Sequence, residues 1–179
     1  MIDFVPACDE MTKIVAGVGD GRLDDPTPCA DYRVRDLLEH VDQVAAGFAA
    51  AARKEEADPD TVDFGVGWRE RMAEHLRDLA AAWAAPAAWE GMGPGAGIEL
   101  PNERWGKIAF TEVVVHGWDL ARATGQGFAL PESSVRACWA HVEEFVPQAP
   151  VPGLWGPPVE VAEDAPLMDR IVGLTGRRP

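Results

Sequence analysis

Hydrophobic residues recur at helical spacing over most of this chain. The clearest segment, residues 33–54, repeats its apolar positions three and four residues apart, the pattern of a helix with one buried face. Those positions are Val34, Leu37, Leu38, Val41, Val44, Ala45 and Phe48. The same period, with glycine and proline signals at its ends, predicts further helices. The predicted helices span residues 3–18, 33–54, 62–85, 103–123, 132–145 and 166–174.

Strand-like alternation is confined to one short segment. Between residues 89 and 102 glycines alternate with other residues, and a short hairpin is expected there. Helices joined by short loops, each with one apolar stripe, predict an all-α fold, an up-and-down four-helix bundle. We expect one domain over residues 1–179, with a core at roughly 3–146 and a small, proline-rich C-terminal extension at 147–179.

Composition narrows the range of partners. The chain has 179 residues, 47% of them hydrophobic, which suffices for one full core. Its formal net charge of −14 repels phosphate backbones and anionic lipid, so neither nucleic acid nor a membrane is an expected partner. Three widely spaced cysteines without a Cys-x-x-Cys pair fit a reducing compartment. With no signal peptide at the N-terminus, a cytoplasmic location is expected.

Two ionisable residues fall on the predicted core stripe of helix 103–123. Glu112 and His116 are four residues apart and therefore share one helix face. An unpaired buried charge costs several kcal/mol, so this pair needs a partner. His40, on the inner edge of helix 33–54, can supply it. The residues alone leave two alternatives open, a metal ion held by the three side chains or a buried hydrogen-bonded ion pair.

Two imidazoles and a carboxylate are the ligand set of a zinc site with one open position. The same set suits ferrous iron, so the ligands do not fix the metal. Asp119 follows His116 by three residues. It can accept a hydrogen bond from the His116 imidazole, or form an ion pair with Arg122.

The remaining candidate residues give weaker indications of function. Cys29, near the start of helix 33–54, is the one thiol of interest, and a buried structural role is the expected one. His75 has no evident role. Trp89 and Trp155 lie in predicted loops and could line a cleft or a homodimer interface.

Three segments of the chain carry a family resemblance. They are residues 27–40 (TPCADYRVRDLLEH), 111–125 (TEVVVHGWDLARATG) and the tail 156–179. They resemble the actinobacterial DinB/YfiT-like metal-binding proteins, which are related to the N-terminal domain of mycothiol-dependent maleylpyruvate isomerase. The resemblance covers essentially the whole chain. It implies a four-helix bundle with a divalent metal held by His40, Glu112 and His116.

The metal implied by this resemblance is Zn²⁺, with Ni²⁺, Fe²⁺ and Mn²⁺ as alternatives. The implied function is that of a mycothiol-type, thiol-dependent isomerase or S-transferase acting on a small molecule. A non-catalytic metal sensor, buffer or resistance protein is the alternative, and a purely structural polar triad is a third. The isomerase has a second, C-terminal domain for which this chain leaves little room, so maleylpyruvate is not the expected substrate. Arg33 stands where the family commonly caps its second helix with Ser or Thr, a change that costs about 1 kcal/mol if nothing substitutes.

Overall fold

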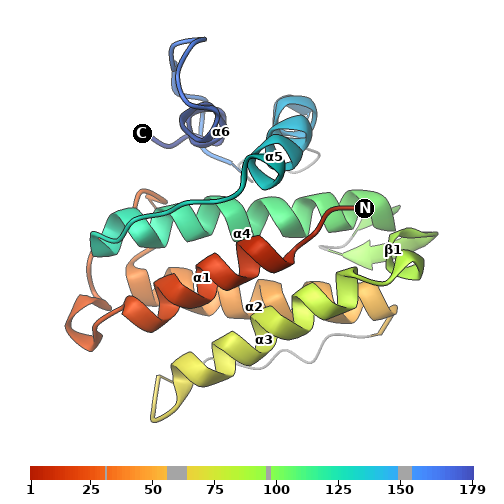
Figure 1. Ribbon diagram of the computed structural model, residues 1–179, viewed down its shortest axis with the longest axis horizontal. Helices are drawn as coiled ribbons and strands as arrows, with labels where there is room; N and C mark the ends of the chain where they lie inside the picture. The colour runs from red at the N-terminus through yellow and green to blue at the C-terminus, as the bar shows by residue number, and fades with distance from the viewer. Residues whose placement is uncertain (31, 56–63, 96–97, 149–154) are drawn as a thin grey trace.

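The computed structural model is mostly helical (Figure 1), and it describes all residues except 31, 56–63, 96–97 and 149–154. Three single-turn 3₁₀ helices join the longer elements: Asp20–Arg22, Pro86–Trp89 and Val146–Gln148. The α-helices and strands are α1 Val5–Gly17, α2 Val34–Arg53, α3 Trp68–Trp83, β1 Met92–Gly95, β2 Ile98–Pro101, α4 Asn102–Thr124, α5 Glu132–Phe145 and α6 Leu167–Leu174.

Helices α1 to α4 form the bundle, which confirms the all-α prediction. Each of α1 and α2 packs against both α3 and α4. The helices α1 and α4 run in one direction and α2 and α3 in the other (Figure 1). The order therefore departs from strict alternation of consecutive helices, because α2 and α3 run in the same direction.

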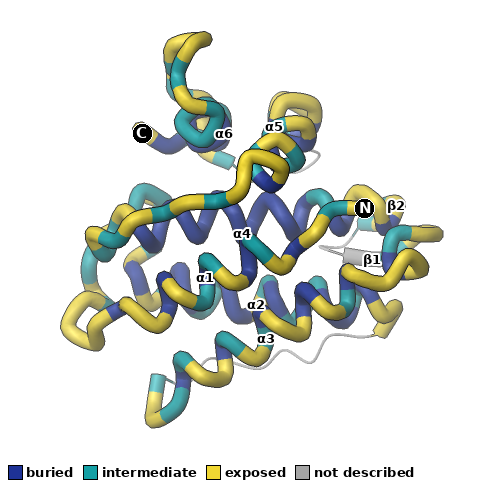
Figure 2. Tube along the Cα trace, in the orientation of Figure 1, coloured by how far each residue is buried: buried dark blue, intermediate teal, exposed yellow. Residues whose placement is uncertain are grey.

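Helix α4 lies at the centre of the molecule. Every residue from Ile108 to Ala121 is buried, since the bundle covers one side of α4 and the α5–α6 pair covers the other (Figure 2). The contacts of α5 with α4, and of α6 with α5, place the C-terminal helices on the bundle. The sequence predicted one buried apolar face for this helix, whereas the structure buries all sides of it between Ile108 and Ala121.

The hairpin expected before α4 is present. Strands β1 and β2 pair antiparallel, with Met92 opposite Pro101 and Gly95 opposite Ile98. The indole Nε1 of Trp105 donates a hydrogen bond to the Gly93 carbonyl at 2.7 Å. This bond fixes the hairpin against the first turn of α4.

The predicted helix boundaries agree with the structure within two residues, except at the start of α3. That helix begins at Trp68, whereas residues 62–63 of the prediction lie outside the described residues. Phe64 to Gly67 form a turn, and Gly67 adopts a left-handed φ of 83°, which a helix interior excludes. Among the described residues, none of the helices is both long and apolar enough to cross a bilayer.

The start of α2 compensates in part for Arg33 at its N-cap. The Asp36 carboxylate accepts a hydrogen bond from the Arg33 backbone N–H at 2.9 Å. This is the reciprocal half of a capping box, and it does not depend on a Ser or Thr at the cap.

Two helical glycines should respond in opposite ways to alanine. A Cβ on Gly106 would lie 2.7 Å from a ring carbon of Trp83 and 2.8 Å from one of Trp89, whereas a Cβ on Gly47 meets nothing within 4 Å. We expect Gly106→Ala to lower the free energy of unfolding by about 1–3 kcal/mol through overpacking. Gly47→Ala should raise it by up to about 1 kcal/mol through helix propensity.

Urea denaturation of the two variants beside the wild type measures both effects under the same conditions. Equal stabilisation by the two substitutions would contradict the close packing of the tryptophans against α4.

Candidate metal centre

The structure brings His40, Glu112 and His116 together between α2 and α4. The Oε2 atom of Glu112 lies 3.0 Å from His40 Nε2 and 3.1 Å from His116 Nε2. One ligand atom from each of the three residues lies within 4.8 Å of the other two. The two imidazole rings meet edge to face, with their centroids 4.9 Å apart.

Local structure explains this convergence. Glu112 and His116 lie one turn apart on α4, and the antiparallel packing of α2 against α4 brings His40 opposite them. Tyr32 stacks on the His40 ring, with centroids 5.4 Å apart. His40 keeps 28% of its side chain exposed, whereas those of Glu112 and His116 are buried, so the group lies at the rim of the core.

The second nitrogen of His116 is held by Asp119. The distance from His116 Nδ1 to Asp119 Oδ2 is 3.0 Å, and Asp119 is fully buried. The guanidinium of Arg177 donates to both oxygens of Asp119, with its shortest contact 2.9 Å from Nη2 to Oδ2. The ion pair considered for Asp119 therefore forms with Arg177, since Arg122 lies over the Trp118 ring instead.

The hydrogen bonds fix the charge of His116. Both of its nitrogens face carboxylates, so each must carry a proton to donate. Burial alone would lower the pKa of His116, but the hydrogen bonds to Asp119 and Glu112, with their charges, raise it to about 9. Burial would likewise raise the pKa of Glu112, but hydrogen bonds from His116 and His40 outweigh it and hold that pKa below its usual range. In this structure His116 is thus an imidazolium between two carboxylates.

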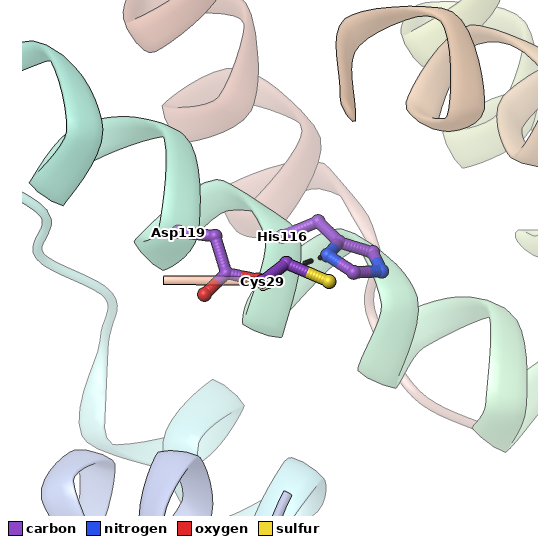
Figure 3. A group of neighbouring side chains, drawn as sticks. All are labelled: Cys29, His116 and Asp119. Atoms are coloured by element: carbon purple, nitrogen blue, oxygen red, sulfur yellow. Dashed lines mark hydrogen bonds and ion pairs between the residues drawn. The ribbon is translucent and has the colours of Figure 1, made fainter. Parts of the chain in front are cut away.

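Cys29 lies beside the His116 ring, close to Asp119 (Figure 3). Ligand atoms of these three residues also lie within 4.8 Å of one another. Cys29 is half-buried and lines a cavity, which differs from the buried structural role expected from the sequence. The expectation was wrong because the segment before α2 passes over the site instead of packing into the core.

A cavity of about 570 Å³ adjoins the His40–Glu112–His116 group. This volume lies within the range of small-molecule sites. The C-terminal segment closes one side through Trp155 and Arg177, and apolar side chains from α2, β2 and α4 form much of the remaining wall. They are Val44, Phe48, Ile98, Leu100, Trp105 and Ile108.

The two loop tryptophans differ in position. Trp155 lines this cavity, with its ring centroid 6.3 Å from that of His116. Trp89 packs on Trp83 within the bundle, at 5.0 Å. A homodimer stays a prediction.

The sequence patterns did not identify Arg177 as part of this group. Arg177 follows Gly176, whose φ of 90° is left-handed and turns the chain after α6 back towards α4. The Arg177 N–H bonds to the Val172 carbonyl at 2.8 Å, which fixes this turn. The glycine after a short helix was the one available signal, and it does not tell which helix the arginine reaches.

His75, for which the sequence suggested no role, lies outside the His40–Glu112–His116 group. Its Nδ1 atom is 2.8 Å from Oδ1 of Asp42, which joins α3 to α2. This pair provides an imidazole–carboxylate contact that can serve as a reference for the candidate metal centre.

Comparison with known proteins gives consistent matches. The chain is 30% identical over 179 residues to proteins from two strains of Mycobacterium tuberculosis, both described as uncharacterized. The match covers 96% of this chain and 93% of each relative. The crystal structure of a histidine-to-alanine mutant of the mycothiol-dependent maleylpyruvate isomerase is similar in fold, with a TM-score of 0.57 and 16% identity. That match covers 78% of this chain and 66% of the isomerase chain, just under two thirds of its length.

A family model agrees with these matches. The model of the mycothiol maleylpyruvate isomerase N-terminal domain matches residues 4–121, a span that includes α1 to α3, the hairpin and α4 through Ala121. With this match and the relatives along nearly its whole length, the chain belongs to the mycothiol maleylpyruvate isomerase N-terminal domain family.

Proposed function

We propose that this protein binds one divalent metal ion, Zn²⁺ in the first place, through His40, Glu112 and His116. The observation that carries the proposal is the convergence of two imidazole Nε2 atoms on one carboxylate oxygen, at 3.0 and 3.1 Å. A metal ion can replace the protons that now bridge these atoms. Ni²⁺, Fe²⁺ and Mn²⁺ are the alternative ions, since the ligand set suits them as well.

The surroundings of the three side chains fit a metal centre. Asp119 holds His116 through Nδ1, so Nε2 is the nitrogen left for a metal, as in the carboxylate–histidine pairs of zinc proteins. Arg177 balances the charge of Asp119, and the buried pair can persist when a metal takes the proton's place on Nε2. Three protein ligands leave one position free, and the adjoining cavity gives access to it.

We further propose that the metal centre serves a mycothiol-type isomerase or S-transferase reaction. When bound, the metal would hold the thiol and lower its pKa, so that a thiolate is present at neutral pH. The residues of this chain would position the small-molecule partner: the apolar side chains of the cavity would surround it, and Arg177 and Trp155 close one side. A sensor, buffer or resistance protein would use the same three ligands without the thiol.

Removal of one proposed ligand should strongly weaken metal binding. We expect reconstituted wild-type protein to hold about one Zn²⁺ per chain, and His116→Ala to bind it more than about 100-fold more weakly, since it loses a direct ligand. Elemental analysis and competition with a chelator measure both quantities. His75→Ala is the matched control because it removes an imidazole hydrogen-bonded to a carboxylate outside the site, and it should retain wild-type affinity. Wild-type protein with well under one ion per chain would refute metal binding.

Metal affinity should depend on pH through His116. Because the pKa of this imidazole is about 9, it carries a proton at neutral pH that the metal must displace. The affinity for Zn²⁺ should therefore fall as pH falls, by at least about tenfold per unit between pH 8 and pH 6. Calorimetric titration in two buffers of different ionisation enthalpy should detect release of at least one proton per ion bound. Affinity that is constant over this range would show that metal binding does not displace the His116 proton.

Addition of a thiol should change the spectrum of the cobalt-substituted protein. The catalytic proposal predicts a saturable change in absorbance with mycothiol, because the thiol would enter the open position. His116→Ala should not respond. Stoichiometric cobalt with no spectral change for mycothiol or cysteine would leave the sensor or buffer function and exclude the thiol-dependent one.

A further inference from the structure

A second hollow lies away from the metal centre, where the start of α4 meets α5. Its volume is about 190 Å³, and polar side chains supply most of its wall. Arg104 and Lys107 come from α4, and His141 comes from α5. Neither the family match nor the proposed metal chemistry accounts for this hollow.

His141 is the unusual member of this group. It is only 6% exposed, and its Nε2 atom has no hydrogen-bond partner in the described part of the chain. Its Nδ1 atom lies 2.9 Å from the hydroxyl of Thr111, and its ring stacks on Phe145 with centroids 4.8 Å apart. A buried polar nitrogen without a partner costs about 1–3 kcal/mol, so a ligand or water is expected opposite it.

The hydrogen bonds of Thr111 indicate which nitrogen of His141 carries the proton. The Thr111 hydroxyl has two side-chain neighbours, His141 Nδ1 at 2.9 Å and the Cys138 thiol at 3.9 Å. An imidazole nitrogen is a much better acceptor than sulfur, so the hydroxyl donates to Nδ1 while the thiol donates to the hydroxyl oxygen. The ring proton then lies on Nε2. His141 therefore lines the hollow with a buried Nε2–H that has no acceptor among the described residues.

The other groups around the hollow favour an anion. Lys107 forms an ion pair with Glu103 at 2.7 Å, whereas Arg104 forms none with any described residue. The hollow touches the first turn of the 23-residue α4, whose N-terminus has no side-chain cap among the described residues. Exposed N–H groups and the helix dipole at such an end attract negative charge. Glu103 and Glu144 also line the hollow, both at exposed positions, and oppose this attraction. The ion pair of Glu103 with Lys107 neutralises the first of them.

We propose that this hollow, formed by His141, Arg104, Lys107 and the N-terminus of α4, binds the oxyanion group of a small molecule, a phosphate or a carboxylate. The Nε2–H of His141 supplies a fixed neutral donor, and Arg104 supplies the positive charge. A divalent cation is disfavoured here, because His141 offers a proton in place of a lone pair. The hollow has room for one such group with a few waters.

The direct test uses nitrogen-15 NMR of the histidine side chains. Inorganic phosphate and acetate, each titrated at constant ionic strength, are the probes. We expect one of the two to shift the His141 Nε2 resonance and the backbone amides of Glu103 and Arg104 along one saturable curve. The probe with the tighter curve identifies the preferred group. The side-chain nitrogen resonances of His40 and His116 should not shift, which distinguishes this site from the metal centre.

Charge-removing variants complete the test. Arg104→Gln should weaken binding by about tenfold, the loss of one charge-assisted hydrogen bond at an exposed position. Arg35→Gln is the matched control, because it removes an exposed arginine at the start of α2, and it should change affinity by less than about twofold. His141→Phe keeps the stacked ring and removes the donor, and it should abolish the response.

Three results would overturn the proposal. The His141 Nε2 resonance could fail to shift with either anion, or Arg104→Gln and Arg35→Gln could weaken anion binding equally. The third is a shift of the His141 resonance with Zn²⁺ instead of the anions. The same anion titrations on His40→Ala, which lacks one proposed metal ligand, test whether the anion response is independent of the metal centre. Wild-type protein that gives the anion response but binds no metal would refute the proposed function alone.

Discussion

A buried line of alternating charge is the constraint on which this structure depends. It runs from the Glu112 carboxylate through the His116 imidazolium and the Asp119 carboxylate to the Arg177 guanidinium, with contacts of 3.1, 3.0 and 2.9 Å. Any one of these charges alone in the core would cost several kcal/mol. Together they are neutral, and each donor has an acceptor. The line also joins the C-terminal segment to α4, so the tail contributes to the site as well as covering it.

This line explains how a metal ion could enter the core at low cost. The His116 Nε2 proton and a metal ion occupy the same place between His116 and Glu112, and each carries positive charge to the carboxylate. Exchange of the His116 Nε2 proton for a metal ion would leave the ion pair of Asp119 with Arg177 intact. In the proposed metal site the buried geometry would be in place before the metal arrives, and a proton that the same carboxylates hold tightly would compete with the metal.

Helical period predicted the fold and the members of the triad because both are local properties of a helix. Glu112 and His116 share a face by their spacing, and His40 lies on a strong amphipathic pattern. The partner of Asp119 was not predictable in the same way. Arg122 was the local choice at three residues, yet Arg177, 58 residues away, forms the ion pair. Such a contact depends on the turn at Gly176 and on how α6 packs against α5, which no local pattern contains.

The burial of α4 on all sides gives adjacent residues separate roles. Successive residues of a helix point about 100° apart, so Thr111 faces His141 on α5 while Glu112 faces His40 on α2. A helix with one buried stripe could serve only one of these faces. Because the α5–α6 pair covers the outer side of α4, that side supports a buried imidazole of its own. The chain beyond α4 therefore does two things at once: it contributes Arg177 to the group at the candidate metal centre, and it supplies His141 to the second polar hollow.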